Sequence, residues 1–237
     1  MDEAQPGRRQ RHRERTEREI KEAAMAEVRQ RGAEAVTLRG VARRAGLSPA
    51  GMYRYVDSRD ALLTWLIADG FHDYADHLES ALAEAPAGVA ERLAAVALAY
   101  RGWAVEHANT FGLLFGDPVP GYHAPPQGET TDAMRRLGVA LATPVIEAYQ
   151  LGTLRVPETL TDESLASQLE PMQQVGAHLP SEVYALLLLL WGRLHGQVIL
   201  EVFGHHAWLF PDGCEPLYRL EVATLLADLG LRGPLDS

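Results

Sequence analysis

The chain has 237 residues, enough for one large domain or two ordinary ones; 47% of them are hydrophobic and 23% are charged. This composition is typical of a soluble globular protein with a core of its own. The single cysteine, Cys214, excludes an intramolecular disulfide framework and a cysteine-rich zinc site. Because we find no uncharged apolar run of about 18 residues and no secretory signal, we expect a cytoplasmic protein without a membrane partner.

The net charge of −10 is unevenly distributed along the chain. Residues 1–59 hold 14 basic and 9 acidic residues, whereas residues 60–237 hold 8 basic and 23 acidic residues. Such asymmetry indicates a polyanion-binding end and an acidic body. A plain solvated face is the other interpretation, so the charge supports a nucleic-acid partner without establishing one. Residues 1–15 are expected to form a basic, flexible arm, which carries Arg8, Arg9, Arg11 and Arg13.

Helical periodicity dominates the rest of the chain, beginning at Thr16. Apolar residues recur at every fourth position up to Gly32, which predicts a first helix. A short second helix follows Thr37 and ends at Gly46, a residue that tolerates a left-handed backbone. Ser48 then caps a third helix that begins with proline.

The remaining chain predicts a further series of helices and no strand, because no alternation of period two is found. The predicted helices start at Asp57 or Ser58 and then cover about residues 88–108, 111–115, 129–151 with a kink at Pro144, 161–174, 181–205 and 215–229. We therefore expect an all-α fold with a three-helix head over residues 16–63 and a helical-bundle body over residues 64–237.

The segment 37–63 carries the pattern of a helix-turn-helix, in which two short helices are joined by residues 46–48. The small side chains of Pro49, Ala50 and Gly51 allow the backbone to approach base edges in a major groove. Arg39 can reach a guanine edge or a phosphate. Hydroxyls, a guanidinium and helix N-termini suit phosphate oxygens, and the residues expected to touch them are Thr37, Ser48, Tyr53, Tyr55 and Arg59.

Residues 16–63 closely resemble the DNA-binding domain of TetR-family regulators. The resemblance rests on Gly32-Ala33, Val36-Thr37, Val41-Ala42, Ala45-Gly46-Leu47-Ser48, Met52-Tyr53-Arg54-Tyr55-Val56 and Ser58-Arg59-Asp60-Ala61-Leu62. It implies the same phosphate contacts, and it places Arg39, Pro49, Ala50, Gly51 and Arg54 nearest the bases. Residues 49–51 depart from the commoner polar or lysine-containing pattern, which favours readout of DNA shape. Two alternatives remain open: Tyr53 packs against the first helix, or Arg54 is simply solvated.

The second half contains Trp191-Gly192-Arg193-Leu194-His195-Gly196, which resembles the W…HG signature of one TetR effector-domain class. In that class the last two long helices pair with their symmetry mates. The resemblance thus implies a homodimer interface at Trp191, Gly192, His195, Gly196, Leu200 and Phe203. A symmetric dimer implies a palindromic operator with half-sites roughly 34–36 Å apart.

An effector pocket is expected where one polar group lies among aromatic and methionine side chains. The resemblance to the TetR family implies which segments line the effector cavity, and the candidates on those segments are Trp103, His107, Phe111, Phe115, Met134 and Met172. The same pattern is also typical of an ordinary helical core. His195, His205 and His206 match no zinc spacing, so we expect neither a metal nor another cofactor.

The sequence thus favours a ligand-responsive DNA-binding repressor, released from DNA by a small lipophilic or aromatic effector, rather than an enzyme. The alternative is a helical small-molecule-binding protein or enzyme that merely retains a helix-turn-helix head. We find no glycine-rich phosphate loop, G-x-S-x-G elbow or H-E-x-x-H motif. Cys214 adjoins Glu215, a poor setting for a reactive thiolate.

Overall fold

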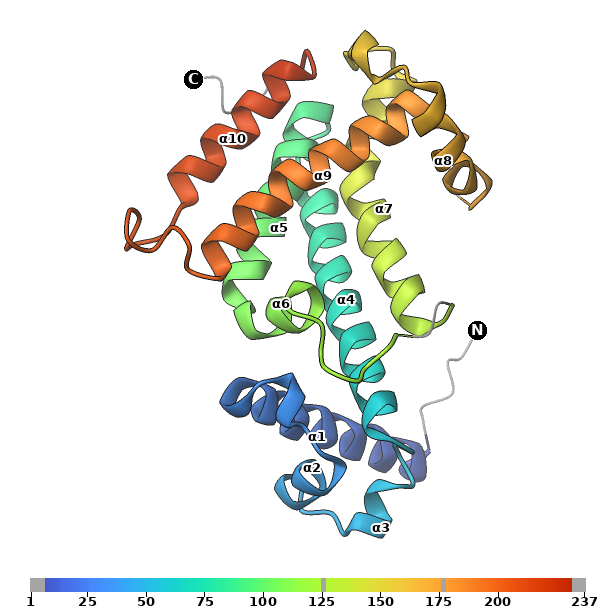
Figure 1. Cartoon of the computed structure of the whole chain (residues 1–237), viewed down its shortest axis with the longest axis vertical. Coiled ribbons are helices and arrows are strands. Elements are labelled where there is room, and N and C mark those ends of the chain that lie inside the picture. Colours follow the sequence, from blue (N-terminus) through green and yellow to red (C-terminus); the bar gives the residue numbers. More distant parts are fainter. Residues whose placement is uncertain (1–6, 125–126, 176–177, 232–237) are drawn as a thin grey trace. The chain divides into compact units, whose positions relative to one another are not determined.

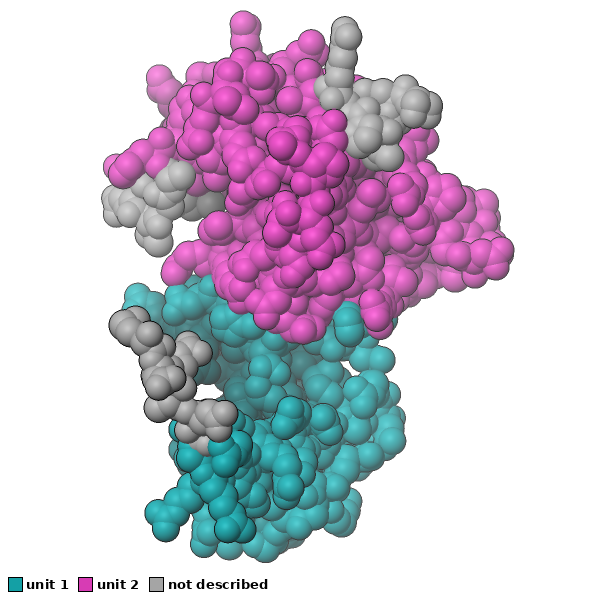
Figure 2. All heavy atoms as spheres, turned by 180° about the vertical axis from the view of Figure 1, so that it is seen from behind, with its two compact units in different colours: residues 1–72, 107–134 teal, residues 73–106, 135–237 magenta. Residues whose placement is uncertain are grey.

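The computed structural model describes residues 7–124, 127–175 and 178–231, and every regular element in these ranges is a helix (Figure 1). The prediction of an all-α fold is confirmed. The chain divides into two compact units, coloured teal and magenta in Figure 2. Unit 1 comprises residues 1–72 and 107–134, and unit 2 comprises residues 73–106 and 135–237. The boundary predicted between residues 63 and 64 therefore differs from the observed division, which adds residues 64–72 and 107–134 to the N-terminal unit.

Unit 1 is built around one apolar core. Its elements are α1 (Arg8–Arg31), the 3-10 helix η1 (Ala33–Ala35), α2 (Leu38–Arg44), α3 (Pro49–Met52), the first part of α4 (Arg59–Glu84), α6 (Ala108–Phe115) and the start of α7 (Glu129–Gln150). Apolar side chains from α1 to α4 form one buried cluster, which includes Ile20, Ala24, Val41, Met52, Val56, Leu62 and Leu66. The apolar residues that recur at helical spacing in the sequence, such as Ile20 and Ala24, are therefore the residues that are buried in the structure.

Side-chain caps define the starts of the short helices. The Oγ1 atom of Thr37 accepts a hydrogen bond from the N–H of Gly40 at 3.1 Å, and the Oγ atom of Ser48 accepts one from the N–H of Gly51 at 3.0 Å. Each bond satisfies a backbone donor that a helix start leaves without an intrahelical partner. Gly46, with φ of +70°, makes the left-handed turn between α2 and α3. The predicted Ser48 cap, the predicted helix start after Thr37 and the glycine turn are confirmed.

The start of α1 differs from the prediction. Residues 8–15 belong to the predicted flexible arm, yet the helix begins at Arg8. Two ion pairs at i,i+4 spacing support these turns, Arg13 with Glu17 at 2.8 Å and Arg15 with Glu19 at 3.3 Å. Arginine and glutamate also favour helix without any apolar face. A search for apolar periodicity could not detect this extension.

Unit 2 is a bundle in which one central helix contacts three other α-helices and a short 3-10 helix. Its elements are the rest of α4, α5 (Val89–Glu106), most of α7, the 3-10 helix η2 (Glu158–Leu160), α8 (Glu163–Val175), α9 (Ser181–Val202) and α10 (Glu215–Asp228). The central helix α9 contacts α5, α8 and α10. It ends at Val202 rather than at the predicted His205, because the chain turns at Gly204, which has a φ of +75°.

By length and composition, α9 is long and apolar enough to cross a membrane. It packs on α5, α8 and α10, and 39% of its most apolar 18-residue window is buried. It also carries Arg193, whose guanidinium forms ion pairs with Glu221 at 2.7 Å and Asp228 at 2.8 Å on α10. These contacts make α9 the central helix of unit 2.

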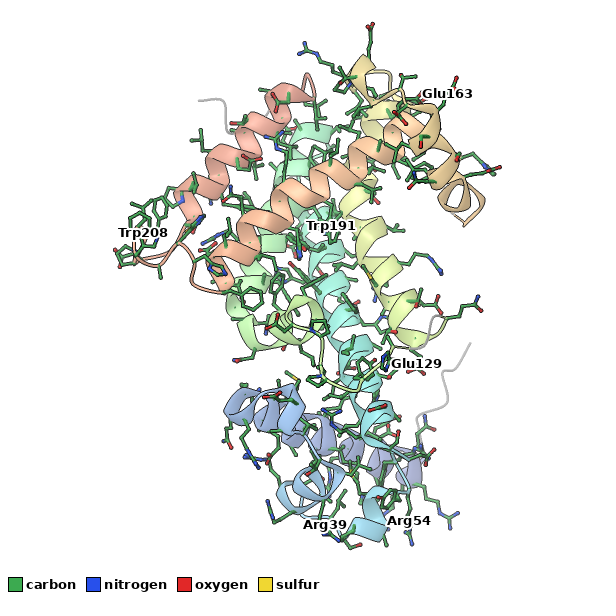
Figure 3. The ribbon with its side chains drawn as sticks, in the orientation of Figure 1. Arg39, Arg54, Glu129, Glu163, Trp191 and Trp208 are labelled. Atoms are coloured by element: carbon green, nitrogen blue, oxygen red, sulfur yellow. The ribbon has the colours of Figure 1, made fainter. Side chains whose placement is uncertain are left out.

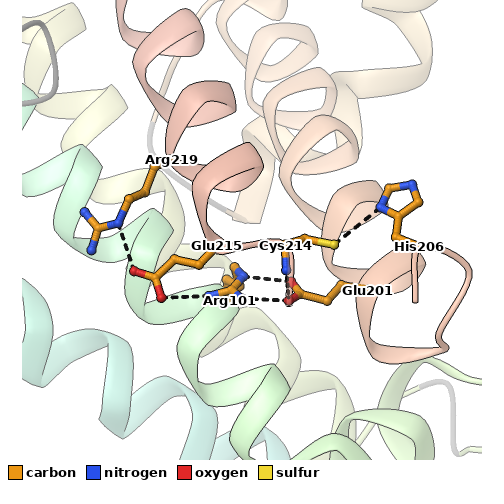
Figure 4. Close-up of polar contacts among 6 residues, drawn as sticks. All are labelled: Arg101, Glu201, His206, Cys214, Glu215 and Arg219. Carbon is orange, nitrogen blue, oxygen red and sulfur yellow. Dashed lines mark hydrogen bonds and ion pairs between the residues drawn. The ribbon is translucent and has the colours of Figure 1, made fainter. Parts of the chain in front are cut away.

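A polar network holds the C-terminal end of α9 against α5 and the start of α10 (Figure 4). The carboxylate of Glu201 accepts hydrogen bonds from Nε and Nη2 of Arg101, at 2.7 and 2.6 Å, and from the N–H of Cys214 at 2.8 Å. Burial opposes ionisation of Glu201, but the hydrogen bonds from Arg101 and Cys214 outweigh it and lower the pKa of the carboxyl group. The network fixes where the loop after α9 leaves and rejoins the bundle.

In unit 1, Arg59, the first residue of α4, joins separate segments of the chain as the Glu201 network does in unit 2. Its Nε atom donates to the carbonyl of Val36 at 3.0 Å, and its Nη2 atom lies 3.2 Å from the carbonyls of Ala33 and Glu34. The guanidinium therefore ties η1 and the entry of α2 to the start of α4.

We predict that Arg59→Ala lowers the free energy of unfolding by about 2 kcal/mol, because backbone acceptors lose charged hydrogen-bond donors. Urea unfolding followed by circular dichroism measures this change. The matched control is Arg54→Ala, since Arg54 is an exposed arginine of the same unit; it should leave the unfolding midpoint unchanged. Equal midpoints for the two variants would contradict the assignment.

Candidate nucleic-acid interface

The structure brings most of the predicted DNA-contacting residues onto one surface of unit 1. Arg39 on α2 and Arg54 after α3 point away from the helical core at the same end of the unit (Figure 3). The side chains of Val41 and Met52, on the opposite faces of these helices, are fully buried. The exposed members of the predicted set are Thr37, Arg39, Ser48, Pro49, Ala50, Tyr53 and Arg54, and Gly51 and Tyr55 are half-buried.

The two tyrosines differ in their surroundings. Tyr53 is 57% exposed, so the alternative in which it packs against α1 does not hold in this structure. Tyr55 packs against the buried apolar cluster of unit 1, and the guanidinium of Arg13 lies 5.9 Å from the centre of the Tyr55 ring. A cation at this distance from an aromatic ring is attracted to it. Tyr53 is thus largely exposed to solvent, whereas Tyr55 links this surface to the first turns of α1.

Arg59 stands apart from the rest of the predicted set. Three of its contacts are with backbone carbonyls, and its Nη1 atom lies 3.8 Å from Asp60. This geometry favours a positioning role for Arg59 over the predicted phosphate contact. No sequence pattern indicates this role, since the carbonyls that Arg59 binds belong to a short 3-10 turn and its end, which periodicity does not reveal.

A buried carboxylate that the sequence motifs do not single out also orients this surface. Glu27 of α1 is almost fully buried and accepts a hydrogen bond from Nε of Arg44 at 3.1 Å, while Arg31 lies 3.7 Å away. The bond joins α2 to α1 beneath the exposed residues. Position 27 falls seven residues after Ile20, on the apolar face of α1, and this placement is the signal that could have identified it.

The predicted pocket residues are divided between the two units. Trp103 belongs to unit 2 and is 2% exposed; its Nε1 atom donates to Asp73 at 3.0 Å and its ring stacks on Tyr74. Phe111 is fully buried in unit 1. The structure therefore places Trp103 and Phe111 as core side chains.

The remaining pocket candidates have varied settings. Phe115, half-buried, has its ring centre 5.1 Å from that of Phe111. His107 directly precedes α6, and Met134 is exposed. The side chain of Met172 lies outside the described residues.

One face of α9 leaves apolar side chains in solvent, namely Leu188, Leu189, Trp191 and Leu200, and Phe203 just after the helix is exposed as well. A Cβ atom added to Gly192 or Gly196 would meet no other atom within 4 Å, so both glycines border open space. His195 differs from the other predicted interface residues, because its ring is half-buried and its Nδ1 atom lies 2.7 Å from the hydroxyl of Tyr100. Burial lowers the pKa of His195. Its contacts are thus within the fold.

Comparisons with known proteins match both parts of the chain. The family model described as bacterial regulatory proteins, tetR family, matches residues 20–64, and that of the tetracyclin repressor-like C-terminal domain matches residues 93–225. The HTH-type transcriptional regulator Rv1816 of Mycobacterium tuberculosis is 35% identical over 202 residues, which are 84% of this chain and 86% of the relative.

Solved structures agree with these matches. The crystal structure of the regulatory protein SCO4313 has a TM-score of 0.76 and 31% identity, and the match covers 94% of this chain and all of that one. The transcriptional regulator FadR from Bacillus subtilis shares the fold, with a TM-score of 0.62 at 14% identity over 90% of this chain and 99% of that one. With an exposed helix-turn-helix surface, matches to both domains and a relative at 35% identity, this chain belongs to the TetR family of transcriptional regulators.

Proposed function

We propose that this chain is a ligand-responsive repressor that binds a palindromic operator as a homodimer and leaves it when a small apolar effector binds. The observation that carries the proposal is the joint exposure of Arg39 and Arg54 beside the capped starts of α2 and α3. Family membership supports transcription regulation in general, and the exposed arginines support the DNA contact on which the finer proposal depends. A DNA partner is consistent with a cytoplasmic location.

On DNA, the surface divides into positioning and reading groups. Thr37, Ser48 and Tyr53 present hydroxyls at the edge of the surface, where they contact phosphates and set the register of the helix. Pro49, Ala50 and Gly51 project little from α3, so its backbone comes close to the groove floor. Because these side chains offer few hydrogen-bonding groups, discrimination between bases comes from Arg39 and Arg54 and from DNA shape.

The apolar face of α9 is the proposed dimer interface. Gly192 and Gly196 lie four residues apart on this helix, and the open space beside them allows a second helix to approach closely. Leu189, Leu200 and Phe203 add exposed apolar side chains to this part of the surface. A second copy placed on this face by a two-fold axis presents a second recognition helix, which matches the symmetry of a palindromic operator.

The proposed effector is apolar or aromatic, and its proposed site includes Phe115. The half-buried ring of Phe115 contacts Phe111 and Phe71, with ring centres 5.1 and 5.5 Å apart, and thus forms the accessible side of an aromatic cluster in unit 1. FadR of Bacillus subtilis was solved in complex with stearoyl-CoA, so this fold can hold a long apolar ligand. A ligand shifts a DNA-binding equilibrium only by binding the two states unequally, and a nearly complete switch needs about 5.5 kcal/mol.

The second candidate function is a helical ligand-binding protein or enzyme whose head no longer binds DNA. Family membership and the exposed arginines favour the repressor. Binding of the wild-type chain to the DNA upstream of its own gene separates the two: a repressor retains a distinct site in that DNA when excess unrelated duplex is present, and a protein with an inactive head retains none.

We predict that Arg39→Ala weakens operator binding by about 1–3 kcal/mol and relaxes preference at one position of each half-site, because a guanidinium that pairs with a guanine edge is removed. Fluorescence anisotropy on operator and scrambled duplexes measures both effects. Arg43→Ala removes a neighbouring exposed charge on α2 and serves as control, with the base preference unchanged. The assignment is wrong if Arg39→Ala weakens binding to both duplexes equally, since Arg39 would then be a phosphate contact.

We predict that Leu189→Glu converts the dimer into monomers, because burying a carboxylate in an apolar interface carries a large desolvation cost. Sedimentation velocity at micromolar concentration gives the oligomeric state. Val139→Glu is the matched control, since Val139 on α7 is 59% exposed and Leu189 is 56% exposed. A monomeric wild-type chain, or a Leu189→Glu variant that stays dimeric, would refute the interface.

We predict that Phe115→Ala reduces effector-induced release from DNA and leaves operator binding intact, because the accessible ring of the aromatic cluster is removed. Release is measured by anisotropy with a panel of acyl-CoA thioesters and aromatic carboxylates. Trp103 and Phe111 are unsuitable for this test, since truncating such buried rings costs about 3–5 kcal/mol of stability. Phe210→Ala, at a half-buried ring in unit 2, is the control. Unchanged release from Phe115→Ala would place the effector elsewhere.

A further inference from the structure

The first turns of α1 extend beyond the core of unit 1. The first buried residue of α1 is Thr16, and all residues from Arg8 to Arg15 are exposed. This extension of two turns is about 12 Å long. It is strongly basic, and the arginines in it and in the turn that follows are Arg8, Arg9, Arg11, Arg13, Arg15 and Arg18.

One face of α1 packs on the buried apolar cluster of unit 1. In the extension, the positions on this same face are occupied by two arginines. The buried residues Thr16, Ile20 and Glu27 mark that face. Counting back by the same helical spacing reaches positions 13 and 9. Arg9 and Arg13 therefore occupy the side of the helix that is directed toward the helix-turn-helix, where the core has ended.

A contact supports this placement for the second of the two arginines. The guanidinium of Arg13 lies 5.9 Å from the ring centre of Tyr55, a residue of the segment that follows α3. Figure 1 shows the N-terminal end of α1 beside this segment. Arg13 uses its Nε–H to bind Glu17 at 2.8 Å, and a guanidinium has four further N–H donors. Arg9 lies one turn further from the core.

We propose that Arg9 and Arg13 form a second DNA-backbone contact, which holds phosphates flanking the half-site that α3 reads. The inference rests on the proposed DNA-binding function and extends its surface along the duplex. Phosphate is the matching partner because the pair is cationic, exposed and next to a residue predicted to contact phosphate. A contact of this kind adds affinity and salt dependence without adding base preference.

Another face of the same helix offers a matched control. At 3.6 residues per turn, positions 8 and 15 share a face of α1 that differs from the face of positions 9 and 13. Arg15 is paired with Glu19 at i,i+4 spacing, as Arg13 is with Glu17. The double variants Arg9→Gln/Arg13→Gln and Arg8→Gln/Arg15→Gln therefore remove the same charge and one equivalent ion pair each, and only the helix face differs.

The probe is a duplex selected by the wild-type chain from a random-sequence library. It is prepared in two lengths, one ending at the protected half-sites and one with about eight flanking base pairs, or about 27 Å, on each side. Affinity is measured across a salt series for the wild-type chain and both double variants. Circular dichroism of each protein checks that α1 stays helical.

We expect the Arg9→Gln/Arg13→Gln variant to reduce the salt slope on the long duplex by about 0.9 for each phosphate that is no longer neutralised, or about two units for each head. On the short duplex its slope should match that of the wild-type chain, because the flanking phosphates are absent. The Arg8→Gln/Arg15→Gln variant should show a smaller change that does not depend on duplex length.

Two results would overturn this inference and leave the proposed function standing. The first is an equal salt slope for the two double variants on the long duplex, which would show that only total charge matters. The second concerns the ratio of the affinities for the long and the short duplex: if this ratio is the same for the Arg9→Gln/Arg13→Gln variant as for the wild-type chain, the pair makes no flanking contact. Failure of the wild-type chain to enrich any duplex would instead overturn the proposed function, and the inference with it.

Discussion

The recognition helix α3 is four residues long, far too short to be stable in isolation, and the whole DNA-binding surface depends on what holds it. The Ser48 cap satisfies one backbone donor at its start, and the burial of Met52 anchors its end. Around it, the buried carboxylate of Glu27 joins α1 to α2 through Arg44, and Arg59 joins the entry of α2 to α4. The exposed residues of the surface are thus positioned by partly buried polar contacts within unit 1.

Much of the fold could be predicted from the sequence, because helix starts and apolar spacing are local properties. Ser48 caps α3 and Gly46 makes the turn, as predicted, and the later helices begin close to their predicted starts. The misses have a physical cause. The extension of α1 before Thr16 is stabilised by charge pairs rather than by an apolar face. Helix α9 ends early because the chain turns at Gly204, directly after the apolar residues Val202 and Phe203, so apolar spacing alone does not mark its end. The grouping of residues 107–134 with the head depends on contacts between distant parts of the chain, which no local pattern encodes.

In the candidate site, too, features that depend on local sequence could be predicted and features that depend on distant contacts could not. Exposed residues such as Tyr53 and Arg54 could be predicted because a helix-turn-helix fixes which positions face outward. Arg59 could not, since its partners are backbone carbonyls and the sequence does not show their geometry. The aromatic candidates for the effector pocket are equally ambiguous: Trp103 and Phe115 occur in similar helical patterns, yet Trp103 is a core residue and Phe115 is half-buried. Spacing predicts burial, and it does not distinguish a packed core from the wall of a cavity.

The loop between α9 and α10 has a practical consequence for experiments. It ends at Cys214, the only cysteine of the chain, whose side chain is buried with Sγ lying 3.7 Å from Nδ1 of His206. Burial raises the pKa of the thiol, so at neutral pH it stays protonated and reacts slowly with alkylating reagents. The native chain therefore reacts little with thiol-directed labels. A single cysteine introduced at an exposed position can carry a spin label or a fluorophore without removal of the native one, which makes distances between labelled copies directly measurable.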